Sequence, residues 1–155
     1  MTEGLNHFYT HDHERLDQLF ERFQQLKGKN LPAAKVLLEE FRAGLQQHMA
    51  WEEAILFCEY DDRTRHPEES PTAELRSDHH EILAHLEAIE DKIARSDANT
   101  EAEERRFLKT LSAHNRMMSA PKVSITFKGS VVLPFDFDIF SPLASIVKPW
   151  VRTAS

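Results

Sequence analysis

The chain has 155 residues, of which 41% are hydrophobic and 29% are charged, as expected for a single globular domain. Its formal net charge of −7 argues against nucleic acid and anionic membranes as partners. We expect a cytoplasmic protein, because the sequence shows neither a membrane-spanning apolar run nor a signal peptide and has a single cysteine, Cys58.

The first half of the sequence predicts two helices. The KGKNLP segment separates them, and Pro32 suits the first turn of the second helix. Apolar and histidine residues recur every three or four positions in both, which predicts one buried face on each helix. The first face carries His13, Leu16, Phe20, Phe23 and Leu26, and the second carries Ala34, Leu38, Phe41, Leu45, His48, Glu52 and Ile55.

The second half predicts two more helices after a polar connection, CEYDDRTRHPEESP. The third buried face is Leu75, His79, Ile82, Leu86, Ile89 and Ile93, and the fourth is Glu104, Phe107, Leu108, Leu111, His114 and Met118. Connections this short favour antiparallel neighbours, so the fold predicted for residues about 5–118 is an all-α, up-down four-helix bundle.

An internal repeat relates the two halves. His13 and His79 are 66 residues apart, as are His48 and His114, and Asp12 corresponds in the same way to Asp78. The repeat predicts a duplicated helical hairpin with one inward-facing histidine on each helix. Four helices closing on one another would bring four imidazoles to one place, which is the arrangement of a metal site.

Glu52 strengthens this interpretation. It lies four residues after His48, so both side chains belong to one helix face, within the apolar stripe. Burying a carboxylate without a partner costs on the order of several kcal/mol of folding free energy. A cation coordinated by the carboxylate would remove that cost. Imidazole and carboxylate together suit iron, manganese or zinc better than calcium or magnesium.

Other candidate residues have simpler interpretations. Glu53 is expected to be an outer or exposed group, and Cys58 a small buried residue. Five further histidines fall off the stripes and are expected at the surface or rim: His7, His11, His66, His80 and His85.

Four motifs in this order resemble the hemerythrin-like HHE cation-binding domains. They are DHxxL at 12–16, HxxxEExxLF at 48–57, DHxxI at 78–82 and HN at 114–115. The resemblance covers residues about 5–117. It implies a non-haem iron site, normally di-iron, with five ligands carried over by position: His13, His48, Glu52, His79 and His114.

The resemblance also implies a role. Such domains bind oxygen, sense iron or oxygen, or respond to nitric oxide and oxidants, which favours a binding protein over an enzyme. Hemerythrins proper have a second histidine on the third helix, where this chain has Leu83, so the broader HHE group fits better. The alternatives are a degenerate bundle with weak or no metal binding that acts as an interaction module, and a di-iron oxidase or peroxidase.

The sequence changes character after Met118. The repeat calls for a carboxylate at that position, matching Glu52, and its absence predicts that only one metal position is well occupied. Residues 119–155 contain four prolines, no glutamate and two alternating, strand-like runs, so we expect an irregular or disordered tail. Read one base earlier, the ATG codons of Met117 and Met118 give aspartate at 118. A frameshift is therefore one explanation of the tail.

Overall fold

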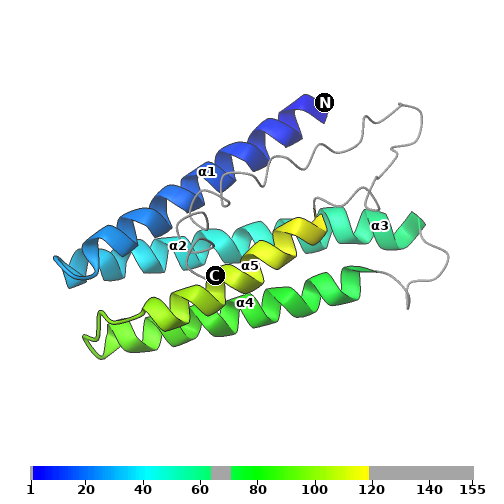
Figure 1. Cartoon of the computed structure of the whole chain (residues 1–155). Helices are drawn as coiled ribbons and strands as arrows, with labels where there is room; N and C mark the ends of the chain where they lie inside the picture. Colours follow the sequence, from blue (N-terminus) through cyan, green and yellow to red (C-terminus); the bar gives the residue numbers. More distant parts are fainter. Residues whose placement is uncertain (1, 64–70, 119–155) are drawn as a thin grey trace, which may run out of the picture.

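The computed structural model describes residues 2–63 and 71–118, and within these ranges it is a bundle of four long helices (Figure 1). The predicted strand-like runs of the tail lie outside the described residues. The elements are α1 (Thr2–Leu26), α2 (Leu31–Trp51), the π-helix η1 (Glu52–Phe57), α3 (Cys58–Arg63), α4 (Pro71–Ala94) and α5 (Glu101–Met118). None of the described helices is long and apolar enough to cross a membrane.

The helices pair as two antiparallel hairpins, α1 with α2 and α4 with α5, and α2 lies against α4 (Figure 1). Local signals explain where α2 and α5 begin. Asn30 caps α2 by accepting a hydrogen bond from the backbone N–H of Ala33, and Pro32 lies in the first turn. Helix α5 follows Thr100 and carries three glutamates in its first turn, where negative charge is favourable.

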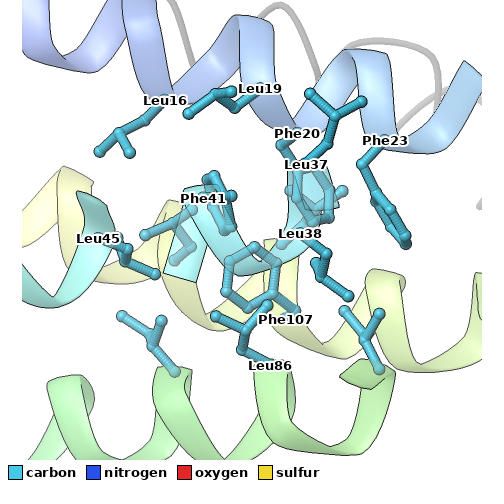
Figure 2. Close-up of a cluster of buried hydrophobic side chains, with 14 of the residues drawn as sticks. Leu16, Leu19, Phe20, Phe23, Leu37, Leu38, Phe41, Leu45, Leu86 and Phe107 are labelled. Carbon is cyan, nitrogen blue, oxygen red and sulfur yellow. The ribbon is translucent and has the colours of Figure 1, made fainter. Parts of the chain in front are cut away.

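The four predicted faces meet in one apolar core (Figure 2). The rings of Phe20, Phe41 and Phe107 pack at its centre, with centroids 4.9 to 5.9 Å apart. Phe41 and Phe107 are related by the 66-residue repeat, and both are almost fully buried. The repeat therefore correctly predicted which faces turn inward.

Two parts of the second helix differ from the sequence prediction. Ile55 is 44% exposed, whereas Leu56 and Phe57 are buried. Helical structure also continues through η1 and α3 to Arg63, several residues into the predicted connection. The exposure of Ile55 follows from η1, because a π-helix has more residues per turn than an α-helix and so shifts the buried face. Cys58, expected to be buried, is also exposed.

Polar contacts close the bundle where α1 ends and α5 begins. Lys27 donates to the carboxylate of Glu104 at 2.5 Å, to Glu101 at 3.0 Å and to the hydroxyl of Thr100 at 3.0 Å. Gln24 donates to the second oxygen of Glu104 at 2.8 Å. Glu104 was predicted to lie on the buried face, and it is 3% exposed. The apolar core separates this polar cluster from the histidines, which lie farther along the helices.

Candidate metal centre

Each of the four long helices contributes one buried histidine to the seam between the hairpins. His13 comes from α1, His48 from α2, His79 from α4 and His114 from α5, and each is between 2% and 4% exposed. These are the four histidines singled out by the repeat. Of the histidines expected elsewhere, His11 and His80 are exposed and His85 is partly exposed, whereas the side chains of His7 and His66 lie outside the described residues.

Glu52 lies at the centre of this group and is 1% exposed. Its Oε1 atom is 3.1 Å from Nε2 of His48, which belongs to the same hairpin. Its Oε2 atom is 2.9 Å from Nε2 of His79 and 3.6 Å from Nε2 of His114, which belong to the other hairpin. One carboxylate therefore faces imidazole nitrogens of both halves of the repeat.

The five side chains form two unequal groups. Ligand atoms of Glu52, His79 and His114 all lie within 4.8 Å of one another, and the Nε2 atoms of the two histidines are 3.3 Å apart. On the other side of Glu52, the rings of His13 and His48 meet edge to face, with centroids 4.3 Å apart. Glu52, His79 and His114 thus form a compact set of three donors. His13 and His48 form the second group, which Glu52 reaches through Oε1.

A cavity of about 20 Å³ lies beside this seam, large enough for one water-sized molecule. His13, His48, Glu52 and His114 line it from one side. Apolar side chains and one amide complete its wall: Leu16, Phe41, Leu45, Met49, Leu111 and Asn115. A small molecule in the cavity would therefore touch the candidate ligands and otherwise meet mainly hydrocarbon.

The π-helix explains why two consecutive glutamates reach the seam. Glu52 begins η1 and faces inward with His48, whereas Glu53, 41% exposed at its side chain, places Oε1 2.7 Å from Nδ1 of His79. His79 is thus held at both ring nitrogens, and Glu53 has the outer position expected of it.

Two further carboxylates contact the outer nitrogens of the histidines, and sequence reasoning gave them no role. Asp12 Oδ2 lies 3.2 Å from Nδ1 of His48, and Asp78 Oδ2 lies 3.4 Å from Nδ1 of His114. The two contacts are related by the repeat. Each Asp-His dipeptide supplies one histidine to the seam and one carboxylate to the histidine of the next helix. The repetition of this dipeptide in the sequence could have indicated the role of the two aspartates.

The electrostatics of the seam follow from these contacts. Burial opposes charging of His48, yet hydrogen bonds to Asp12 and Glu52 and their negative charges raise its pKa to about 9. Burial likewise opposes charging of His79, and its contacts with Glu52 and Glu53 outweigh it, so the pKa rises. Burial would raise the pKa of Glu52, but hydrogen bonds from the three histidines hold it well below its usual range.

These shifts describe a centre that is built around a buried negative charge. In the absence of a metal, protons on His48 and His79 balance Glu52. A divalent cation would supply the same countercharge and displace those protons, because imidazole binds metal through a deprotonated nitrogen. The donor set, imidazole nitrogen with carboxylate oxygen, fits a first-row transition metal.

The fourth helix lacks the carboxylate that the repeat calls for, and Met118 takes its place. Met118 is fully buried in a second apolar cluster with Leu56, Phe57 and Leu75. Phe57 of this cluster stacks on His79, with ring centroids 5.5 Å apart. The position therefore faces the interior, as Glu52 does, but it brings a thioether and no charge.

Comparison with known proteins gave one match. The model of the family described as hemerythrin HHE cation binding domain matches residues 5–119. Neither the curated proteins nor the solved structures gave a match.

Proposed function

The chain belongs to the hemerythrin HHE cation-binding family, and from this premise we propose that it binds non-haem iron in the seam between its hairpins. The proposed ligands are His13, His48, Glu52, His79 and His114. Bound iron would supply redox chemistry and an affinity for small diatomic molecules. We propose that the protein handles or senses oxygen, nitric oxide, iron or oxidants as a binding protein.

The observation that carries the proposal is the burial of Glu52 between imidazoles of both hairpins. A carboxylate that is 1% exposed needs a positive partner, and its two oxygens point to separate donor groups. In this proposal Glu52 would hold a cation on each side, through one oxygen each. His48, His79 and His114 would present their Nε2 atoms to the metal while their Nδ1 atoms contact the outer carboxylates of Asp12, Glu53 and Asp78.

The two positions differ in strength in this proposal. Oxygen Oε2 of Glu52, His79 and His114 form the compact group, and we propose that the first iron binds there. The second position has His13, His48 and Oε1 of Glu52. The two positions would share this one carboxylate, because the repeat counterpart of Glu52 is Met118. Two divalent cations beside one carboxylate repel each other with little compensation, so occupancy should be closer to one iron per chain than two.

The small cavity supports a small ligand. Its volume of about 20 Å³, enough for one water-sized molecule, and its largely apolar wall favour a very small ligand over a bulky organic substrate. This favours oxygen or nitric oxide binding over oxidation of larger molecules. A peroxidase remains the enzymatic alternative, and a metal-free interaction module remains the non-enzymatic one.

Metal analysis of the full chain from iron-supplied cells tests the proposal. We expect about one iron per chain, with an absorption spectrum that changes when oxygen or nitric oxide is added. Glu52→Gln keeps the shape of the side chain and removes its charge, so it should abolish most binding. Glu39→Gln, an exposed change on the same helix, should not.

Each other outcome points to an alternative. A native chain without metal, or a Glu52→Gln variant that binds as well as Glu39→Gln, would overturn the proposed site and favour the interaction module. Sustained turnover of hydrogen peroxide by the iron-loaded protein would favour the peroxidase.

A further inference from the structure

Helix α2 contains a glycine in its interior, where glycine weakens a helix by about 1 kcal/mol relative to alanine. The surroundings of Gly44 explain why a side chain is absent. A Cβ atom at this position would lie 2.7 Å from Cδ2 of Leu16 and 2.8 Å from Nη2 of Arg15. Helix α1 thus approaches α2 closely here, and the guanidinium of Arg15 occupies the space beside Gly44.

Arg15 in turn holds Asp12, one turn earlier on α1. Its Nε and Nη2 atoms donate to Oδ1 of Asp12 at 3.2 and 3.0 Å. The other oxygen of Asp12 contacts Nδ1 of His48 at 3.2 Å, and Nε2 of His48 faces Glu52. Asp12 is 7% exposed, so this chain of contacts runs from the rim of the bundle into the seam.

The other half of the repeat lacks this arrangement. The counterparts of Arg15 and Gly44 are Glu81 and Thr110, whose side chains hydrogen bond to each other at 3.2 Å. A glutamate cannot hold the carboxylate of Asp78. Asp78 lies 3.4 Å from His114 with a side chain that is 21% exposed, against 8% for Asp12. The two hairpins therefore differ where they support their second histidine.

We propose that Gly44, Arg15 and Asp12 form a positioning unit for His48. Arg15 fixes the carboxylate of Asp12, which accepts the Nδ1 hydrogen of His48 and thereby directs Nε2 toward the metal. Gly44 acts only by leaving room for the guanidinium. The unit serves the proposed second metal position, to which His48 and Oε1 of Glu52 belong. This inference rests on the proposed metal site.

Gly44→Ala is the sharpest test, because it should change the position of His48 without changing the thermal stability of the protein. The new methyl group meets the ends of two flexible side chains, so displacing the guanidinium of Arg15 is the easiest response. The gain in helix propensity offsets the strain, so thermal stability should change little. Metal affinity at the second position should nevertheless fall, because Asp12 loses its partner.

Asp12→Ala removes the acceptor itself and should lower affinity at that position about 10- to 100-fold, the usual effect of losing an outer partner of a metal-bound histidine. Arg15→Met keeps the aliphatic stem and should give a smaller loss. Glu81→Gln, at the repeat counterpart of Arg15, is the matched control and should leave affinity unchanged. Affinities are measured by titration with Fe²⁺ under anaerobic conditions and with Zn²⁺ as a redox-inert probe.

A metal-independent measurement separates this inference from the proposed function. In protein labelled with ¹⁵N-histidine, the Nδ1 hydrogen of His48 should give a slowly exchanging, downfield NMR resonance without metal. Asp12→Ala should abolish it and Gly44→Ala should weaken it, whereas Glu81→Gln should not alter it. If the resonance persists in Asp12→Ala, the positioning unit is refuted whatever the metal content. If the resonances behave as expected and no metal binds, only the proposed function fails.

Discussion

Asp17 should make the bundle less stable as the pH rises, and Asp17→Asn should remove that effect. The side chain lies on α1 and is 8% exposed, and neither carboxylate oxygen has a hydrogen-bond partner among the described residues. Burial, with smaller contributions from Glu14 and Glu21, raises its pKa from 3.8 to about 7. The folded state therefore keeps a proton that the unfolded chain releases near pH 4.

The magnitude follows from the difference between the two pKa values. Below about pH 4 the carboxyl group is protonated in both states and costs nothing. Between pH 4 and 7 the unfolded chain binds fewer protons, so the free energy of unfolding falls by about 1.4 kcal/mol for each pH unit. Above pH 7 the loss levels off at about 4 kcal/mol, an upper value because local relaxation would reduce it.

Urea denaturation followed by circular dichroism, with chelator present, measures this directly. The difference between Asp17→Asn and the native chain should grow by about 2 to 3 kcal/mol from pH 5 to pH 8 and then stay constant. Glu39→Gln, exposed on α2, should show no such trend. A stability difference that is the same at pH 5 and pH 8 would refute the assignment of a raised pKa to Asp17.

Three further predictions concern the metal seam and the opposite end of the bundle. Met118→Glu introduces a carboxylate four residues after His114, so the full chain should bind closer to two irons while its metal-free form becomes less stable. An unchanged iron content would contradict the proposal that the missing carboxylate limits iron binding. Metal binding at pH 7.5 should release protons, because the pKa values of His48 and His79 are raised, and affinity should increase as the pH rises toward 9. Calorimetry in buffers of different ionisation enthalpy counts those protons, and a count of zero would rule this out. Lys27→Met leaves the buried Glu104 without its cation and should destabilise the protein by about 3 to 5 kcal/mol in urea denaturation, whereas the exposed change Lys29→Met should have little effect.

The sequence predicted the bundle well because its signals were redundant. Apolar residues recur with the same spacing several times on each buried face. The 66-residue repeat adds a second copy of the hairpin, which shows the same pattern independently. Pairs such as Phe41 and Phe107, or His48 and His114, therefore identified the inward faces twice over, and all four of these side chains are buried.

The details of the site were harder to predict because they depend on side-chain reach and local helix geometry. Residue spacing placed Glu52 beside His48, but it could not show that Asp12 contacts a histidine on the neighbouring helix. Ile55 was assigned to the wrong environment because the periodicity assumed a regular α-helix. Cys58 was assigned wrongly because a small residue at the end of an apolar run was expected to be buried. The tail at 119–155 and its frameshift explanation stay predictions, since that segment lies outside the described residues.

The π-helix also affects how this chain should be aligned with other members of its family. A π-helix has more residues per turn than an α-helix. A regular α-helix would therefore need about one residue fewer to reach the start of α3 with its side chains on the same faces. A relative without the π-turn would therefore match this chain only across a one-residue gap inside a continuous helix. Pairing Phe57 here with the residue that stacks on the equivalent of His79 is the criterion that would place the gap correctly.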